Sequence, residues 1–397
     1  MLWLTKIMLK NRIENMWLSA KFGFVGMMEF KILGDICNIV SGGTPPRSKS
    51  QYWDNGNIPW IKIRDIKSKY IEDSEESITI EGLNNSSTKL LTKGTVLYTI
   101  FATLGEVGIL KIDACTNQAI AGLTVKDETK ILPEYLYYYL KSKKNIVNKL
   151  GRGAAQNNIN LSMLKSFEIE IIDIIKQNNI IRTLNYVDNL IKLKSRELEL
   201  LDELVKARFV ELFGDPVYNE KQWKVEQFGS LGELKRGKSK HRPRNDPILL
   251  GGKYPLIQTG DISNSHTYIQ TYKSTYSEEG LKQSKMWKAG TLCITIAANI
   301  AESAILTFDA CFPDSIVGFL PNDKVNLIFI HHWLDFLQPI LEENAPAVAQ
   351  KNLNVASLEK VGVILPLLEL QNQFADFVKE VDKSRFIIKS MIKEGLL

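Results

Sequence analysis

The sequence contains two collinear copies of one pattern, and this internal repeat constrains its fold more than any other feature. The matched segments keep the same order in both copies, which makes a chance match implausible. The pairs are IPWIKIRDI (58–66) with YPLIQTGDI (254–262), KGTVLYTI (93–100) with AGTLCITI (289–296), DAC (113–115) with DAC (309–311), and AAQNNIN (154–160) with VAQKNLN (348–354). We therefore expect two tandem domains, each of about 150 residues, built on the same plan.

Each copy ends in a segment with the pattern of a long helix. In residues 174–213, apolar residues recur at the 3.5-residue spacing of a coiled-coil seam. The ten seam positions, eight of them apolar, are Ile180, Leu184, Val187, Ile191, Lys194, Leu198, Leu201, Val205, Arg208 and Leu212. Gly214 and Pro216 then predict the end of the helix. The segment 371–397 repeats this opening, with an equivalent seam of Phe374, Val378, Val381, Arg385, Ile388 and Ile392.

A seam needs a partner, so we expect the central and terminal helices to pair with each other. The alternative for the central segment is an ordinary long core helix. At 1.5 Å per residue, a helix of about 40 residues is roughly 60 Å long, which exceeds a small domain and favours a strut between domains.

The remaining segments indicate an α+β fold. The β-branched, Gly-bounded runs at 93–100 and 290–296 are typical of strands, whereas 132–150 and 326–344 carry apolar residues at helical spacing. The predicted architecture is two tandem, pseudo-two-fold-related domains joined by two long antiparallel helices. Its predicted parts are residues 1–27 (an N-terminal extension), 28–173 (first domain), 174–214 (central helix), 215–366 (second domain) and 367–397 (terminal helix).

The extension at 1–27 lies outside the repeat. It is basic and apolar, but charged residues interrupt any signal-peptide core. Either it forms an extra amphipathic helix or the true start is Met27 or Met28.

Composition excludes several classes of protein. With 397 residues, 44% of them hydrophobic and 24% charged, the chain is long enough for two or three cores and is neither disordered nor collagen-like. The four cysteines show no CxxC spacing, which predicts neither a zinc site nor a disulfide framework. No apolar run reaches the roughly 18 residues of a membrane span. We expect a reduced, cytoplasmic protein that does not enter a membrane.

Two segments match catalytic motifs only superficially. GELKRGKS at 232–239 matches the phosphate-binding pattern GxxxxGK[ST], but the HRPRNDP that follows cannot begin the helix which that loop requires. TPPR at 44–47 lacks the polar first residue and the closing aromatic of the amino-methyltransferase tetrapeptide.

His331 and His332 lie on a predicted helix without an HExxH pattern, so we expect a core or surface role for them and not metal binding. No paired nucleophile and base is evident. The sequence therefore predicts no catalytic residue, no cofactor and no metal.

Basic loops recur at related positions of the two copies. The stretch KRGKSKHRPR at 235–244 is dense in Lys and Arg, and Arg47 and Lys49 occupy a similar loop in the first copy. A single charge run is usually a solvated loop, but recurrence favours DNA phosphates as the target. The amides of AQNNIN and AQKNLN can bond adenine edges or cap turns, and both roles stay open. The candidate DNA-binding residues are Arg47, Lys49, Lys62, Arg64, Arg152, Gln156, Asn158, Arg236, Lys238, Lys240, Arg242, Arg244, Gln258, Gln350, Lys351 and Asn352.

Taken together, the SGGTPPRSKSQYW and IPWIKIRDI segments, AAQNNIN, LPLLELQNQF and the two-fold repeat resemble the specificity subunit of type I restriction-modification systems. The resemblance covers residues 28–397. It implies two target-recognition domains that each read one half of a split double-stranded DNA site, with the helices as a ruler between them. It also implies two modification subunits that dock on the helices and methylate adenine, and restriction subunits that add ATP-driven translocation and cleavage.

The ruler has a geometric rationale, because two related modules on a strut suit half-sites about one helical turn, roughly 34 Å, apart. The sequence departs from the family pattern where the first copy has IIDIIKQNN against VILPLLELQNQ in the second, and where the terminal helix is shorter. Two alternatives remain. One is a DNA-binding chain that itself methylates or cleaves DNA, and the other is a scaffold that binds no DNA.

Overall fold

In the computed structural model, the described residues are 29–152, 158–297, 300–343 and 353–394. The expected N-terminal extension at 1–27 therefore lies outside the described residues. The chain divides into two compact units, Met1–Leu190 and Ile191–Leu397.

The first unit contains a five-stranded sheet with the strand order β2-β9-β6-β7-β4, a small sheet β5-β3-β8 and a ribbon β1-β10. Its strands are β1 (Glu29–Ile32), β2 (Cys37–Ser41), β3 (Ile58–Ile61), β4 (Tyr70–Ile71), β5 (Ser77–Ile78), β6 (Val96–Thr99), β7 (Val107–Leu110), β8 (Cys115–Thr116), β9 (Ile120–Val125) and β10 (Glu168–Ile171). Its helices are α2 (Leu33–Ile36), η1 (Ser50–Tyr52), η2 (Ile63–Asp65), α3 (Ile80–Asn84), α4 (Pro133–Arg152), α5 (Leu161–Lys165) and the first part of α6 (Ile174–Phe213).

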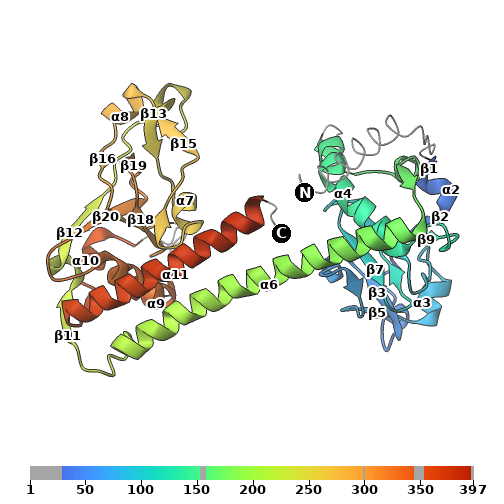
Figure 1. The fold of residues 1–397 in the computed structure, drawn as a ribbon, viewed down its shortest axis with the longest axis horizontal. Coiled ribbons are helices and arrows are strands. Elements are labelled where there is room, and N and C mark those ends of the chain that lie inside the picture. Colours follow the sequence, from blue (N-terminus) through green and yellow to red (C-terminus); the bar gives the residue numbers. More distant parts are fainter. Residues whose placement is uncertain (1–28, 153–157, 298–299, 344–352, 395–397) are drawn as a thin grey trace. The chain divides into compact units, whose positions relative to one another are not determined.

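The second unit has the same plan: a five-stranded sheet β12-β20-β17-β18-β14, a small sheet β15-β13-β19-β16 and a ribbon β11-β21. Its strands are β11 (Lys224–Gln227), β12 (Gly232–Arg236), β13 (Leu250–Leu256), β14 (Tyr268–Ile269), β15 (Ser274–Tyr276), β16 (Met286–Trp287), β17 (Leu292–Thr295), β18 (Ser303–Leu306), β19 (Ala310–Cys311), β20 (Ile316–Pro321) and β21 (Gly362–Leu365). Its helices are η3 (Phe228–Ser230), η4 (Pro247–Leu249), α7 (Thr259–Ser263), α8 (Glu278–Lys282), α9 (Leu327–Glu343), α10 (Val355–Glu359) and α11 (Leu368–Glu394), together with the rest of α6 (Figure 1).

The repeated motifs have matching structural roles. Asp113 accepts a hydrogen bond from the backbone N–H of Lys93 at 2.8 Å, and Asp309 accepts one from that of Ala289 at 3.0 Å, so each DAC aspartate fixes the turn that leads into a central strand. Asn160, at the end of the AAQNNIN segment, caps α5 by accepting from the backbone N–H of Met163 at 2.8 Å. Its counterpart Asn354 caps α10 in the same way. The repeat predicted from the sequence is therefore confirmed in the fold.

A buried glutamine anchors each long helix to its own domain. Gln177 on α6 is fully buried, accepts from the backbone N–H of Leu132 at 2.9 Å, and donates to the carbonyl oxygens of Lys130 and Ile172 at 2.7 and 2.8 Å. Because a buried amide needs all of its partners, this residue fixes the start of α6 against the loop before α4.

Gln371 on α11 is also fully buried and makes the equivalent set of hydrogen bonds in the second unit. It accepts from the backbone N–H of Asn326 at 2.9 Å and donates to the carbonyl oxygens of Lys324 and Pro366 at 3.3 and 2.9 Å. The two glutamines thus fix the two helices in the same way.

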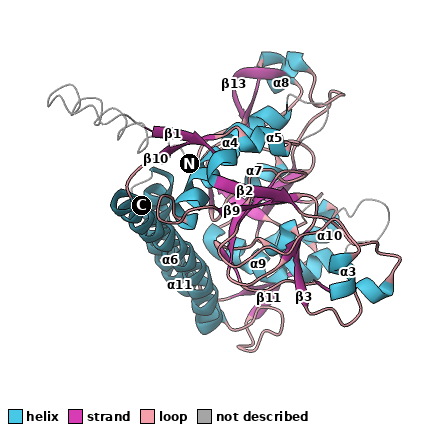
Figure 2. Cartoon of the chain, turned by 90° about the vertical axis from the view of Figure 1, so that its right-hand side faces the viewer, coloured by secondary structure: helices cyan, strands magenta, loops and turns pink. Residues whose placement is uncertain are grey.

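The long helix is confirmed over Ile174–Phe213, and its C-terminal part pairs with α11 (Figures 1 and 2). Phe209 packs edge-on against Phe374 with ring centroids 5.4 Å apart, while Arg385 of α11 forms an ion pair with Asp202 of α6. The helices are antiparallel, since the later residue on α6 contacts the earlier residue on α11. Every predicted seam position on both helices is buried or half-buried.

The seam does not supply all of the buried side chains of α6, however. Beside the seam residues Leu184 and Val205, the helix buries Ile181, Phe209 and Phe213, which lie one position away from the predicted seam. A straight helix has 3.6 residues per turn, so its buried face drifts from a strict 3.5-residue spacing. In α6, the buried face therefore turns away from the seam and toward the core of each domain.

Two large apolar cores organise the units. In the first unit, Ile181 and Leu184 of α6 join the core of the five-stranded sheet and α4. In the second, Phe209 and Phe213 of α6 and Phe374 of α11 join the core formed with α9. Each long helix is therefore part of a domain core. Within the described residues, no helix is both long and apolar enough to cross a bilayer.

Candidate nucleic-acid interface

The basic loop of each copy begins at a glycine that packs directly on backbone. A Cβ at Gly42, just after β2, would lie 2.2 Å from the carbonyl oxygen of Thr116, and one at Gly237, just after β12, would lie 2.3 Å from that of Pro313. Neither approach leaves room for a side chain. The two loops are thus held against the same part of each domain, which fixes where their charged residues emerge.

In the first unit, the predicted cations gather around two glutamates. Arg47 lies 2.5 Å from Glu76, Arg64 lies 2.6 Å from Glu75, and the ammonium of Lys62 forms an ion pair with Glu76 and lies 3.7 Å from Glu75. Burial raises the pKa of Glu76, but hydrogen bonds from Lys62 and Arg47 outweigh this effect and hold the pKa below its usual range. The group keeps a net positive charge.

Aromatic rings orient Arg47 further. Its guanidinium carbon lies 3.5 Å from the ring centroid of Trp53, which in turn meets Trp60 edge-on at 5.0 Å. Lys49, in the same loop, donates to the Tyr52 hydroxyl at 3.0 Å. A guanidinium that is stacked and ion-paired is held in one orientation, which suits it for directional recognition of phosphate or a guanine edge.

In the second unit, three arginines converge on one residue. Arg242 and Arg244 form ion pairs with the Asp314 carboxylate, and Arg236 donates to the Asp314 carbonyl oxygen. Arg242 also donates to the carbonyl oxygen of Ser239 at 2.6 Å. Three guanidinium groups gathered around one residue with a single carboxylate leave a net positive charge at the surface.

The lysines of this loop are exposed, and their backbone is held from α8 and its end. Ser284 donates to the carbonyl oxygen of Lys238 at 2.9 Å, and Gln283 accepts from the backbone N–H of Lys240 at 2.7 Å. The loop backbone is therefore held in place, while the exposed ammonium groups of Lys238 and Lys240 are available to bind an anion. The segment GELKRGKS at 232–239 does not have the form of a phosphate-binding loop, because its first residues belong to strand β12.

The other predicted residues fall in three groups. Gln258 is exposed at the start of α7, where its amide reaches Ser274 at 3.5 Å, and Asn158 pairs with Phe101 beside β6. Arg152 is the last residue of α4. Four predicted residues lie outside the described part of the chain: Gln156, Gln350, Lys351 and Asn352.

Sequence reasoning missed the acidic partners. Glu75, Glu76 and Asp314 define both clusters, yet nothing in their local sequence singles them out. Asp314 and Arg244 are 70 residues apart. The repeat offers one signal that could have identified Asp314. It follows β19 at the position that corresponds to Gln118 in the first copy. Gln118 contacts the first loop there, accepting from Thr44 at 2.5 Å.

Comparison with known proteins fits this arrangement. The family model for the type I restriction modification DNA specificity domain matches residues 26–203 and again residues 220–397. The chain belongs to this family. The two matches correspond to the two copies of the repeat, so the family's domain occurs twice in one chain.

One relative in the specificity-subunit group aligns along nearly the whole chain, and another aligns along about half of it. The MjaIX specificity subunit of Methanocaldococcus jannaschii is 24% identical over 98% of this chain and 96% of its own length. The EcoR124I/EcoR124II specificity subunit of Escherichia coli is 30% identical over 45% of each chain.

Solved structures of the family share the fold. The S subunit of the type I restriction-modification system from M. genitalium superposes with a TM-score of 0.51 at 16% identity, covering 94% of both chains. A second solved structure concerns the complex assembly and conformational transition of the type I R-M system. One of its chains superposes with a TM-score of 0.56 at 16% identity, covering 92% of both chains. The predicted α+β architecture with two tandem domains is thereby confirmed.

Proposed function

We propose that this chain is the DNA-specificity subunit of a type I restriction-modification complex and works in the cytoplasm without catalytic residues of its own. In this proposal each domain reads one half of a bipartite double-stranded DNA site, and α6 with α11 sets the spacing between the halves. The observation that carries the proposal is a cluster of oriented Lys and Arg side chains on the same loop of both copies, after β2 and after β12.

The charge pattern supports phosphate contact and directional readout together. The exposed ammonium groups of Lys238 and Lys240 suit phosphates, which give affinity without sequence information. The ion-paired guanidinium groups of Arg47, Arg242 and Arg244 suit guanine edges, because a bidentate contact needs a fixed orientation. Contact with DNA would exchange part of each carboxylate ion pair for a pair with the nucleic acid.

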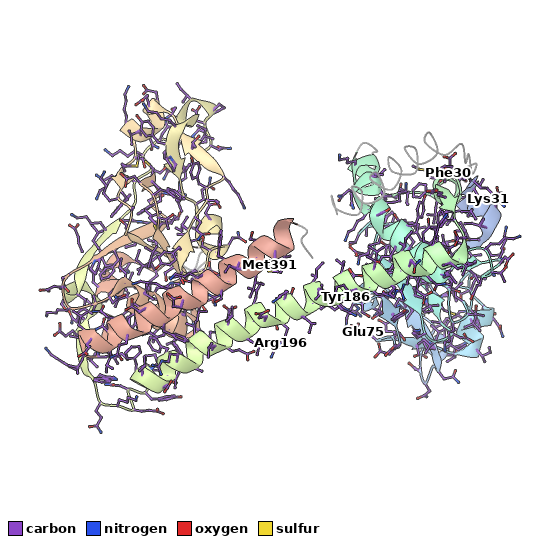
Figure 3. All side chains as sticks on the ribbon, in the orientation of Figure 1. Phe30, Lys31, Glu75, Tyr186, Arg196 and Met391 are labelled. Atoms are coloured by element: carbon purple, nitrogen blue, oxygen red, sulfur yellow. The ribbon has the colours of Figure 1, made fainter. Side chains whose placement is uncertain are left out.

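The helix pair supports docking of two modification subunits. Tyr186, Leu193 and Leu200 on α6 are exposed, and their spacing of seven residues places them on one face of the helix. The Tyr186 side chain projects from α6 in Figure 3. Large apolar side chains along one exposed helix face favour a protein partner. Restriction subunits would then join through the assembled complex.

The salt dependence of DNA binding tests the interface. In the assembly with its modification subunits, Ala at Lys238, Lys240, Arg242 and Arg244 should weaken DNA binding and reduce the slope of log affinity against log salt. The slope should fall by about 0.9 for each phosphate that the protein no longer neutralises. The matched control instead removes four exposed lysines that lie outside both the basic loops and the long helices: Lys130, Lys165, Lys324 and Lys360. An unchanged slope in the loop variant, or an equal change in the control, would refute the assignment.

Adenine methylation separates this function from the enzymatic alternative. Deleting the chain while keeping its modification partner should abolish methylation at a split motif with a fixed spacer. If the purified chain alone methylated or cleaved DNA, it would instead be an enzyme. Ala at Arg47 and Arg64 should relax one half-site only, and the loop variant of the second domain should affect the other half-site.

A further inference from the structure

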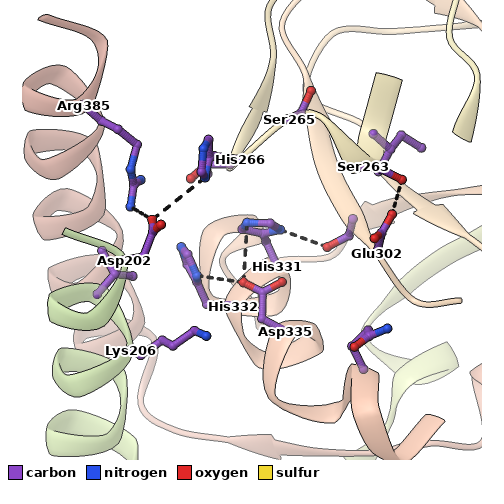
Figure 4. A pocket seen from close by; sticks show the side chains of 15 residues that line it. Asp202, Lys206, Ser263, Ser265, His266, Glu302, His331, His332, Asp335 and Arg385 are labelled. Atoms are coloured by element: carbon purple, nitrogen blue, oxygen red, sulfur yellow. Dashed lines mark hydrogen bonds and ion pairs between the residues drawn. The ribbon is translucent and has the colours of Figure 1, made fainter. Parts of the chain in front are cut away.

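A polar cavity of about 390 Å³ lies in the second unit (Figure 4), and no residue of the basic loop 235–244 lines it. Its walls come from α6, α9, α11, β18 and the segment after α7. Three histidines and three carboxylates line it: His266, His331, His332, Asp202, Glu302 and Asp335. Sequence reasoning had given His331 and His332 a core or surface role, because nothing in the local pattern places a ligand set beside them.

Three of these groups converge on one point. The Nδ1 atom of His332 lies 3.2 Å from Oδ2 of Asp335, and Nε2 of His331 lies 3.9 Å from the same oxygen. One ligand atom from each of the three residues lies within 4.8 Å of the other two. Two ligands about 2.1 Å from a tetrahedral metal ion are about 3.4 Å apart. The observed separations bracket that value.

The surroundings of His331 match those of a metal-binding imidazole. The ring is 5% exposed, and its Nδ1 lies 2.9 Å from the Ser303 hydroxyl on β18. When Nδ1–H donates to Ser303, the Nε2 lone pair faces the Asp335 carboxylate, and a cation between them removes the repulsion. Metal-bound histidines typically donate their second N–H to a polar partner in this way.

The first unit provides an internal comparison. At the corresponding positions α4 carries Tyr137, Tyr138 and Lys141, and the Lys141 ammonium lies 3.2 Å from Asp188 of α6. A built-in cation thus sits where the second unit has Asp335. Among the described residues, Asp335 has ion-pair contacts to the two histidines alone. Lys206 of α6 lines the same cavity but makes no ion-pair contact with Asp335 among the described residues. The second unit therefore combines nitrogen ligands with a carboxylate that has no lysine or arginine in ion-pair contact.

We propose that His331, His332 and Asp335 bind one divalent transition-metal ion of the zinc class, with the cavity supplying space for water ligands. Imidazole together with a carboxylate suits Zn²⁺ and disfavours Mg²⁺, which prefers oxygen ligands. The role is structural. Pro339 has no N–H to donate to the Asp335 carbonyl, so α9 is weakened at this turn. A metal held by residues 331 and 335 clips the preceding turn.

Zinc chloride titrated into the metal-free full-length chain, without DNA, tests the site. We expect one equivalent to bind and to raise the melting temperature, with magnesium chloride giving no effect. Asp335→Asn and His332→Gln should each weaken Zn²⁺ binding at least 100-fold. Ser303→Ala, which alters the positioning of His331 and not a ligand, should weaken binding about 10-fold.

The control is His241→Gln, which changes another histidine paired with a carboxylate, Asp246 at 2.9 Å, and should bind Zn²⁺ as the unaltered chain does. Circular dichroism checks that each variant is folded. If a ligand variant does not fold, the expected weakening of Zn²⁺ binding in Ser303→Ala tests the site in its place. Absence of stoichiometric Zn²⁺ binding, or binding undiminished in Asp335→Asn and His332→Gln, would overturn the proposal. So would a thiolate charge-transfer band on substitution with Co²⁺, since it would place the metal on cysteine. DNA affinity does not enter this measurement, so it can fail independently of the proposed function.

Discussion

Replacing Gln371 by methionine should strongly destabilise the second unit. The side chain is fully buried, and its amide satisfies one backbone N–H and two backbone carbonyl groups. Methionine has a similar volume, so the cost comes from the missing hydrogen bonds and not from a cavity. Each buried polar group left without a partner costs about 1 to 3 kcal/mol. With partial relaxation, we expect the free energy of unfolding to fall by about 3 to 6 kcal/mol.

The repeat supplies a replicate of this experiment. Gln177→Met removes the same three hydrogen bonds in the first unit, so the loss of stability there should be of the same size. Gln373→Met is the control, because Gln373 is exposed two residues further along α11 and should change stability by less than about 0.5 kcal/mol.

Urea unfolding combined with native-state hydrogen exchange measures the effect in each unit separately. Gln371→Met should lower protection in α9 and α11, and Gln177→Met in α4 and the start of α6. A loss of stability below about 1 kcal/mol in both variants would refute the argument, since it would mean that the orphaned backbone groups find other partners at little cost.

Two further predictions concern single residues. Arg385→Met should destabilise the helix pair by about 2 to 4 kcal/mol in urea unfolding, because it leaves Asp382 and the half-exposed Asp202 without their cation; an unchanged midpoint would show that water replaces the pair. Gly237→Ala should cost about 1 to 3 kcal/mol by the same assay, because the new methyl group would lie 2.3 Å from a backbone oxygen. Gly260→Ala, in α7 with no atom within 4 Å, is the control and should leave stability unchanged or slightly raised, and equal effects of the two substitutions would contradict the steric argument.

Much of the fold could be predicted because its signals are local or periodic. The repeat required the two copies to share one topology, and the two sheets and the ribbon recur in the same order. The helical periodicity predicted α6 to its last residue, and the Gly-Pro stop marked its end. The candidate interface was predictable in part, because Lys and Arg density in a loop is visible without any contact.

The partners of those cations were not predictable. Asp314 lies on a turn far along the chain from the arginines it meets, and Glu75 and Glu76 look like any exposed acidic pair. The same limit applies to His331 and His332. Their helix was predicted, but the serine on β18 and the cavity beside them depend on how the sheet, α6 and α11 pack.

The sequence by itself therefore determined the repeat, the two long helices and the location of the basic loops. These follow from the period of apolar residues and from local turn chemistry, which act over a few positions of the chain. Only the tertiary structure decided which charges meet, where a glutamine is buried, and where imidazole and carboxylate groups share a cavity. Such contacts join residues tens of positions apart, and no short-range pattern encodes them.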